Sequence, residues 1–364
     1  MSTVEQALQR IPRWRFALWL ALATVALAVL AYSPRFENWN RGYPYSWETS
    51  RGAGFLMQSQ HPFRTDVEPA IRWRLLPPLL CYAVGLRGVP ALVVPWAGVL
   101  ALLASTAWML LGRAVSRVTT VLGVLLLGTT SAVIISVGWL GMNDAWVWCG
   151  LTVIALARNH PARCGWAWLG PWIDERLLIG LPLAVLLHAK LAGFDTWRAL
   201  LRRNRLVLCG AALYALTRVL ALAFVSGDPS GGFVQWTVLH VHEWLPNAVP
   251  GWWEGLRAAW VLVGLALIIR PHSRLPGLNA ALTVQAVVTV AIMVLLAADL
   301  SRSAAIMVPA AVVAACQLER DRPSLAAGIV ALLLVANLAM PAATVIGPYT
   351  LWLENFVQHN LGRG

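Results

Sequence analysis

The chain has 364 residues, of which 59% are hydrophobic and only 12% are charged. A soluble domain carries roughly twice that share of charge, so the composition excludes a soluble domain and indicates a protein whose surface faces lipid. The net charge of +12 does not indicate a nucleic-acid partner, because the arginines lie in short stretches between apolar runs, as the positive-inside rule predicts.

Apolar runs long enough to cross the roughly 30 Å hydrocarbon layer recur along the chain. The first run is expected to stay in the membrane as an anchor, because no small-residue cleavage site follows Tyr32. We predict an all-α, polytopic transmembrane helix bundle that forms a single domain over residues 1–364. Its nine predicted spans cover residues 16–32, 91–111, 118–138, 140–157, 207–225, 256–269, 278–298, 303–316 and 325–341.

Arginine and the one lysine collect in six short stretches, which the positive-inside rule places in the cytoplasm of a bacterial cell. These stretches are residues 10–15, 113–117, 158–163, 190–205, 270–274 and 320–322. We therefore expect a multi-pass protein of the inner membrane, with the amino terminus inside and the carboxyl terminus outside.

Two further apolar segments do not fit this arrangement as single spans, because either one crossing alone would reverse every later helix. Residues 75–86 are few and include two prolines, which favours an interfacial or re-entrant helix. Residues 166–188 are interrupted by the polar turn at residues 174–176, which favours a helical hairpin whose turn is buried in protein. The alternative for the second segment is an ordinary span with a charged end.

The unusual polar residues then fall on the extracytoplasmic side of the membrane. That side receives a long first loop over residues 33–90, which includes the interfacial helix, and a second loop over residues 226–257. It also receives the turns at residues 141–144 and 299–302. The sequence therefore predicts one outer-face pocket in which scattered acids and guanidinium groups meet.

The first outer loop carries two acids, Asp66 and Glu68, followed by Arg72 and Arg74. Side chains two residues apart on an extended chain point to opposite faces, so at most one carboxylate reaches a reacting hydroxyl. One acid can act as general base while the arginines bind phosphate as planar, permanently charged forks. Alternatively, both acids only neutralise the neighbouring arginines. Glu48, earlier in the same loop, is a weaker candidate.

The layout of a first span, a long outer loop with an acidic pair, a short interfacial helix and many further spans resembles the GT-C class of membrane glycosyltransferases. The stretch from Arg72 to Leu80 and the polar positions at 143–144, 174–176 and 299–302 also resemble features of bacterial membrane proteins of that shape. The resemblance implies a polyprenyl-phosphate-linked sugar as donor. It also implies that Asp66 or Glu68 acts as catalytic base or metal ligand, and no other residue transfers by motif.

Four polar side chains beside or within the predicted spans are further candidates. Asp144 lies at the mouth of a span, where it could hold a sugar hydroxyl or only cap the helix start. Asp299 and Arg302 are three residues apart, so they can pair on one helical face, or Arg302 could bind the donor phosphate. Arg218 lies within a span and must pair with an acid or a phosphate inside the bundle.

His240, His242 and Glu243 lie in the second loop among tryptophans, and alternate histidines can bind metal or shuttle protons. The sequence identifies no cofactor, although a divalent metal could bind here or at the acidic pair. The five cysteines are scattered, without zinc-like spacing, and are expected in the core.

These features lead to the hypothesis of a glycosyltransferase that moves a sugar from a polyprenyl-phosphate carrier to a glycan, lipid or protein hydroxyl. In this hypothesis the first-loop acids activate the acceptor, the arginines steady the leaving phosphate and Asp144 orients the sugar. Two alternatives stay open. Broken helices and membrane-depth charges also mark transporters and lipid or glycan flippases, and the chain could be a non-catalytic subunit of an envelope assembly.

Overall fold

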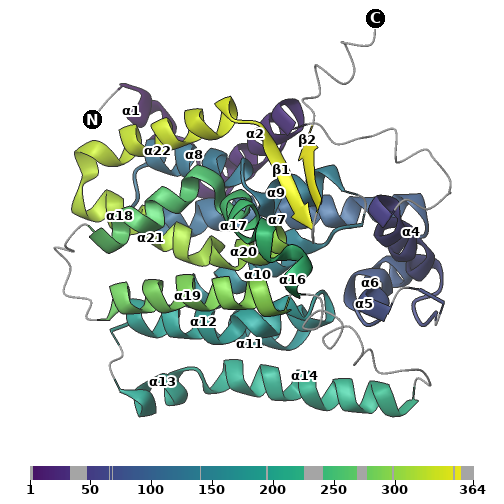
Figure 1. Cartoon of the computed structure of the whole chain (residues 1–364). Helices are drawn as coiled ribbons and strands as arrows, with labels where there is room; N and C mark the ends of the chain where they lie inside the picture. Colours follow the sequence, from purple (N-terminus) through teal and green to yellow (C-terminus); the bar gives the residue numbers. More distant parts are fainter. Residues whose placement is uncertain are drawn as a thin grey trace, which may run out of the picture.

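Helices run side by side through the structure, and one small β-hairpin lies at its carboxyl-terminal end (Figure 1). The computed structural model describes residues 3–32, 47–64, 66–67, 69–139, 141–193, 196–224, 241–268, 277–296, 299–346 and 349–353. The predicted helical bundle is confirmed. The antiparallel pair β1 (Ala342–Ile346) and β2 (Tyr349–Leu353) was not predicted.

The amino-terminal half of the bundle is centred on α10 (Asp144–Leu156), whose residues are nearly all buried because α7, α11 and α12 pack around it. The helix α8 is bent by 54° against α9 at a short break. The elements that precede α10 are α1 (Thr3–Gln9), α2 (Arg13–Tyr32), α4 (Trp47–Gln60), α5 (Pro69–Arg72), α6 (Leu76–Ala83), η1 (Val89–Leu92), α7 (Val93–Gly112), α8 (Arg117–Gly128) and α9 (Ser131–Gly138).

The carboxyl-terminal half adds a second group of helices, of which α14 packs mainly on α11 and α19 packs on α12. Residues 241–257, assigned above to the second loop, are largely helical. The elements are α11 (His160–Leu169), η2 (Gly170–Trp172), α12 (Arg176–Leu191), α13 (Trp197–Arg203), α14 (Arg205–Phe224), α16 (Val241–Trp244), η3 (Leu245–Asn247), α17 (Ala248–Leu256), η4 (Arg257–Ala259), α18 (Trp260–Ile268), α19 (Leu278–Leu296), α20 (Leu300–Ala304), η5 (Ala305–Met307), α21 (Val308–Asp321) and α22 (Pro323–Ala339).

Five helices of the described chain are long and apolar enough to cross a membrane, or six if α8 and α9 form one broken span. Five of these six segments match predicted spans, and the sixth, Val241–Ile268, contains most of the predicted span at 256–269 but begins within the predicted second loop. The other three predicted spans contain shorter apolar helical segments in the described residues: α10, α22 and the part Leu278–Met293 of α19. The structure therefore supports a polytopic membrane protein, but helix length does not confirm the count of nine.

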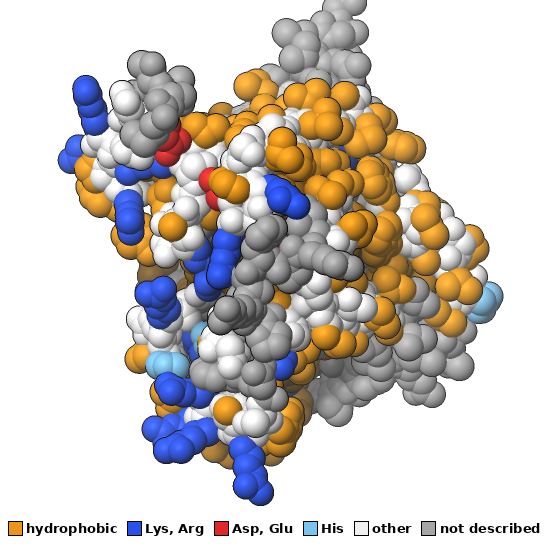
Figure 2. All heavy atoms as spheres, turned by 90° about the vertical axis from the view of Figure 1, so that its left-hand side faces the viewer, with side chains coloured by type: hydrophobic (Ala, Val, Ile, Leu, Met, Phe, Trp, Pro, Cys, Tyr) orange, Lys and Arg blue, Asp and Glu red, His pale blue; other side chains and the backbone are white. Residues whose placement is uncertain are grey.

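The basic stretches meet at one end of the bundle. Arg113 donates a hydrogen bond to the Leu156 carbonyl (2.8 Å), and the Arg117 backbone N–H donates to Glu5 (3.1 Å), so the stretch at 113–117 contacts the segments just before the stretches at 158–163 and 10–15. Figure 2 looks onto that end and shows Lys and Arg side chains gathered on it. The β-hairpin lies at the opposite end (Figure 1). The stretch at 270–274 is outside the described residues.

The two segments that did not fit as single spans both form helices. Residues 75–86 contain the short helix α6, which packs against α4. Residues 166–188 form the end of α11, the 3-10 turn η2 and most of α12, with Asp174 buried in the turn between them. This geometry is the helical hairpin with a protein-buried polar turn that the sequence favours.

One arginine ties the hairpin end of the bundle together. Arg257 is fully buried and adopts a positive φ of 53°. Its Nη1 donates to the Tyr32 hydroxyl (2.8 Å) and the Thr129 carbonyl (3.3 Å), and its Nη2 donates to the carbonyls of Met340 (2.6 Å) and Pro341 (3.0 Å). A single guanidinium group therefore joins α2, the break between α8 and α9, and the chain that enters β1.

Glu254 completes this tie, because its carboxylate lies 3.5 Å from Arg257 Nε and accepts the Ala343 N–H at 3.1 Å. Asn337 adds a second link, since it accepts the Ala258 N–H and donates to the Thr129 hydroxyl, both at 2.8 Å. The hairpin is thus held on the helices by buried polar residues that each have partners, which is the condition for tolerating them in a core.

Replacing Arg257 with methionine should destabilise the protein strongly. The change keeps most of the volume but leaves Glu254 and four oxygen atoms without their donor, and breaking a buried ion pair costs about 3–5 kcal/mol. Thermal unfolding in detergent measures the effect. Arg87→Met is the control, because Arg87 is exposed and stacks on Tyr82. Equal melting temperatures for the two variants would show that the tie does not stabilise the fold.

Candidate functional site

A buried network of acids and arginines lies where several helices begin. Arg302 donates to both oxygens of Asp144, from Nε at 3.1 Å and from Nη2 at 3.0 Å, and its Nη1 pairs with Asp299. The predicted pairing of Asp299 with Arg302 is therefore present. The fork of Arg302 also joins α10 to α20, although the two residues are far apart in the sequence.

The network continues through α12 to the first loop. Arg176 Nη2 lies 2.6 Å from Asp144 and 2.7 Å from Asp174, so two arginines share the Asp144 carboxylate. Asp174 is in turn 2.8 Å from Nη1 of Arg74, whose Nε lies 3.7 Å from Glu175. A continuous chain of ion pairs thus connects Asp299 to Arg74.

Local folding explains why these side chains converge. Asp144 is the first residue of α10, Asp299 immediately precedes α20, and Arg176 opens α12. Helix amino termini present unpaired N–H groups and a partial positive charge, which stabilise nearby carboxylates. Asp174 is stabilised in this way, because its Oδ1 accepts a hydrogen bond from the unpaired backbone N–H of Arg176 at 2.9 Å. Three helix starts at one level of the bundle therefore gather the acids.

Burial makes the ion pairing necessary. Only 1% of the Asp144 side chain and 2% of the Arg302 side chain are exposed, and Asp174 and Arg176 are nearly as buried. A buried charge without a partner costs several kcal/mol, so each acid needs a guanidinium group. Arg74 is 20% exposed, which makes it the most accessible arginine of the network.

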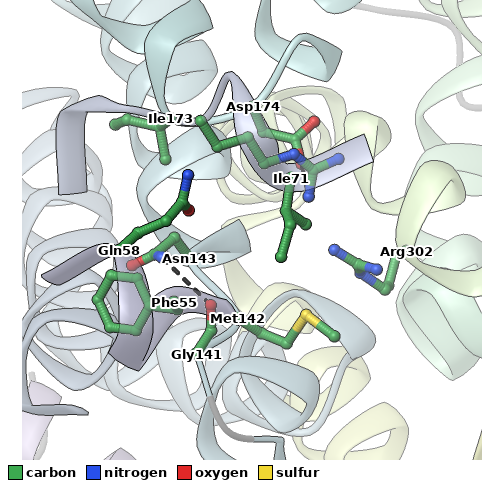
Figure 3. A pocket seen from close by; sticks show the side chains of 10 residues that line it. Phe55, Gln58, Ile71, Gly141, Met142, Asn143, Ile173, Asp174 and Arg302 are labelled. Carbon is green, nitrogen blue, oxygen red and sulfur yellow. Dashed lines mark hydrogen bonds and ion pairs between the residues drawn. The ribbon is translucent and has the colours of Figure 1, made fainter. Parts of the chain in front are cut away.

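A polar pocket opens onto this network (Figure 3). Arg302 and Asp174 lie on its wall, and the Oδ1 atom of Asn143 has no hydrogen-bond partner among the described residues. The cavity volume is about 30 Å³, which is room for about one or two water molecules. Its lining residues are Phe55, Gln58, Ile71, Arg74, Gly141, Met142, Asn143, Ile173, Asp174 and Arg302.

An apolar groove of about 330 Å³ lies next to the polar pocket. Ile173 lines both of them, so the groove and the polar pocket lie on either side of a shared side chain. The remaining lining residues come from α6, α7, α10 and α11 and are Leu76, Pro77, Leu80, Val94, Trp146, Ala162, Gly165, Trp166 and Leu169. Such a pair of cavities suits an amphiphile with an apolar chain and an anionic head.

The structure does not bring the first-loop acid into this pocket. Asp66 is exposed and pairs with Arg64, and it is not among the residues that line the cavity. The hydrogen bond from Arg64 lowers the pKa of Asp66 to about 2, which weakens this carboxylate as a base. Glu68 lies outside the described residues, so its predicted role stays a prediction. The side chain of Glu48, in α4, is also not described.

The other predicted candidates lie in different places. Arg72 ends α5, and its carbonyl accepts a hydrogen bond from Gln58, which lines the pocket. The guanidinium of Arg218 lies over the ring of Trp73, 4.2 Å from its centroid, and near that of Trp172, and no acid among the described residues forms an ion pair with it.

The histidine cluster of the second loop is only partly described. His242 and Glu243 are exposed on α16, and His240 is outside the described residues. Within the ranges that the structure describes, no three His, Cys, Asp or Glu side chains are grouped as a metal site requires. The described acids of the network are instead separated by arginines.

Two members of the network, Asp174 and Arg176, were not named as site residues from the sequence. The sequence did contain a sign of their role, because the polar turn at residues 174–176 interrupts an apolar segment and was expected to be buried. A buried turn with an acid and an arginine must meet complementary charges from other helices. That requirement makes residues 174–176 natural partners for Asp144 and Arg74, which the sequence places at the same membrane face.

Removing the central guanidinium should destabilise the protein much more than removing an exposed one. Arg302→Gln leaves Asp144 and Asp299 without their shared partner, and breaking a buried pair costs about 3–5 kcal/mol. Arg64→Gln, which removes the exposed partner of Asp66, should leave the melting temperature unchanged. Thermal unfolding of both variants in detergent measures the contrast. A melting temperature for Arg302→Gln that equals the wild-type value would contradict the role of the network.

No protein-family model, curated protein sequence or solved structure matches this chain. The functional argument therefore depends on the geometry described above. That geometry consists of a buried acid–arginine network, a small polar pocket on its surface and an apolar groove that adjoins the pocket.

Proposed function

We propose that this protein is a GT-C-like glycosyltransferase that takes a sugar from a polyprenyl-phosphate carrier and passes it to a glycan, lipid or protein hydroxyl. The observation that carries the proposal is the apolar groove that shares Ile173 with a pocket lined by Arg74 and Arg302. A polyprenyl-phosphate sugar has the same order of parts: an apolar chain, a phosphate and a polar ring.

The groove and the pocket divide the recognition of such a donor. The groove lining is almost wholly apolar, so it can bury isoprene units at about 25 cal/mol per Å² of surface removed from water. Arg74 is the network arginine with the greatest exposure and lies beside the phosphate position. Its planar fork suits phosphate oxygens. Arg302 lies deeper and holds Asp144 and Asp299 in place.

The sugar would lie against the polar wall of the pocket. Asn143 offers an Oδ1 atom without a partner in the described structure, and this atom can accept a hydrogen bond from a sugar hydroxyl. The pocket has a volume of only about 30 Å³, so the sugar requires the first loop to move away from it. Both α4 and α5 contribute to the wall, through Phe55 and Ile71, so movement of this loop would widen the cavity.

In the proposed reaction the acceptor oxygen bonds to the anomeric carbon, the bond from that carbon to the phosphate oxygen breaks, and the acceptor proton passes to a carboxylate. Asp66 or Glu68 supplies the carboxylate, since both lie on the loop between α4 and α5. Because Arg64 holds the pKa of Asp66 low, Asp66 becomes an effective base only when that ion pair opens. The arginines stabilise the leaving phosphate, by electrostatics alone or with a bound metal.

The proposed location is the bacterial inner membrane, with nine spans and the residue 166–188 hairpin. The basic end of the bundle faces the cytoplasm by the positive-inside rule, so the amino terminus is inside and the pocket faces outward. In this proposal α10, α19 and α22 also cross the membrane. Membrane lipids and the carrier-linked donor are the expected partners, and protein partners are not identified.

A transporter or flippase is the main rival function. Substrate sites of transporters lie near the bilayer midplane, at broken helices. The acid–arginine network instead gathers at the starts of α10, α12 and α20, toward one end of the bundle. This position favours chemistry at one membrane face. A non-catalytic envelope subunit would tolerate alanine at the polar residues of the pocket.

Filling the groove should weaken donor binding. Gly165 lines the groove, and a β-carbon added there meets no atom within 4 Å, so Gly165→Phe should place its ring in the space of an isoprene unit. The expected loss of affinity for long-chain polyprenyl monophosphate is at least about tenfold, from the apolar contacts removed. Gly264→Phe is the control, because that glycine is equally unobstructed but lies outside the groove.

Binding is measured by microscale thermophoresis in detergent with the polyprenyl monophosphate and, as a second ligand, with the polyprenol that lacks phosphate. Arg74→Gln should weaken binding of the monophosphate and leave the polyprenol unaffected. Equal affinities of the Gly165→Phe and Gly264→Phe variants would remove the groove from the proposal.

The chemical step is tested with the double variant Asp66→Ala/Glu68→Ala in purified protein. Transfer of labelled sugar is assayed from a set of polyprenyl-phosphate sugars, and the folded state is checked by the melting temperature. Loss of a general base should lower turnover by about 10²–10⁴-fold while donor affinity is kept. Unchanged turnover in the folded double variant would exclude a catalytic role for this pair.

A further inference from the structure

A second, strongly basic hollow lies at the basic end of the bundle, far from the acid–arginine network in the fold. It has a volume of about 770 Å³ and is formed where α13 meets α14 beside the start of α11. No acid is among its described lining residues. These residues are His160, Arg198, Ala199, Arg202, Arg203, Arg205 and Leu206.

Buried hydrogen bonds fix the corner that presents these arginines. Asn204 is fully buried between α13 and α14, donates to the Leu200 carbonyl at 2.9 Å and accepts a hydrogen bond from Arg163. Arg163 is also fully buried, and its Nε donates to the Ile154 carbonyl at 2.8 Å. The turn between α13 and α14 is therefore anchored on α10 and α11. The basic side chains around it project from a rigid corner.

The flanks of the hollow are apolar and open. Trp197, at the start of α13, is 69% exposed, and tryptophan at a helix end favours the membrane interface. Leu206 and Leu208 continue this surface along α14, and both are exposed. Only 17% of the apolar segment of α14 is buried inside the protein, so most of this helix faces outward. A charged hollow is thus continuous with a lipid-facing helix surface.

We propose that this hollow binds the phosphate headgroup of an anionic phospholipid from the leaflet at the basic end, with the acyl chains along the exposed face of α14. Guanidinium forks bind phosphate oxygens with two hydrogen bonds each, and arginines from α13 and α14 approach the headgroup from two sides. Basic hollows between membrane helices are suited to such headgroups. This site is independent of the proposed glycosyl transfer.

The test compares lipids with purified full-length protein in nanodiscs of phosphatidylcholine. Phosphatidylglycerol is titrated in, and binding is followed by native mass spectrometry and by the melting temperature. Each arginine near the surface contributes about fivefold to the attraction of anionic lipid. The variant Arg198→Gln/Arg202→Gln/Arg205→Gln should therefore lose about a hundredfold in apparent affinity. Its three single variants should each lose about fivefold, which covers the case in which the triple variant does not fold.

The control variant is Arg10→Gln/Arg13→Gln/Arg15→Gln, which removes the same charge from exposed arginines of the amino-terminal basic stretch. It should keep wild-type affinity for phosphatidylglycerol. An equal loss in the two triple variants would show attraction by net charge alone and would overturn the site. Inorganic phosphate is the second probe, and binding as tight as that of the lipid would overturn the assignment to a phospholipid.

Discussion

The guanidinium group of Arg302 holds together two parts of the chain that lie 158 residues apart, because both oxygens of Asp144 accept its hydrogen bonds. Asp144 also pairs with Arg176, and through Asp174 the contact reaches Arg74 on the first loop. In a bundle with so little charge, this network gives the helices a defined register that apolar packing alone does not. Arg74, Asp174 and Arg302 of this network also line the polar pocket, and the ion pair of Arg74 holds the first loop against it.

The helices could be predicted from the sequence because a helix that faces lipid or the protein core needs a long run of apolar residues. Each predicted span overlaps a helix in its described residues, and the described basic stretches lie toward one end of the bundle. The sequence did not reveal the β-hairpin, since Ala342–Ile346 reads as one more apolar stretch. Arg257 and Glu254 hold it through contacts between segments far apart in the chain, at the Met340 carbonyl and the Ala343 N–H. Contacts of that range have no periodic signal.

Part of the candidate site could also be predicted, because helix geometry places some of its residues together. Asp299 and Arg302 are three residues apart on a helix, so their pairing follows from helix geometry. The partnership of Arg302 with Asp144 does not follow from spacing, although both were expected at the same membrane face. Asp66 was expected near them, but Arg64 lies two residues away and forms the shorter-range ion pair. Asp66 therefore pairs with a neighbouring arginine and does not reach the pocket.

The charge balance of the network has a consequence for any anion that enters it. Four acids of the network, Asp144, Asp174, Asp299 and Glu175, pair with three arginines, Arg74, Arg176 and Arg302, so the site has no excess of positive charge. Extra negative charge is costly in a poorly solvated interior. An anion must therefore bring a proton or a cation with it, or displace a carboxylate from its guanidinium. Under the proposed function, ligand entry at this site would exchange one counterion for another and would break ion pairs that join the helices.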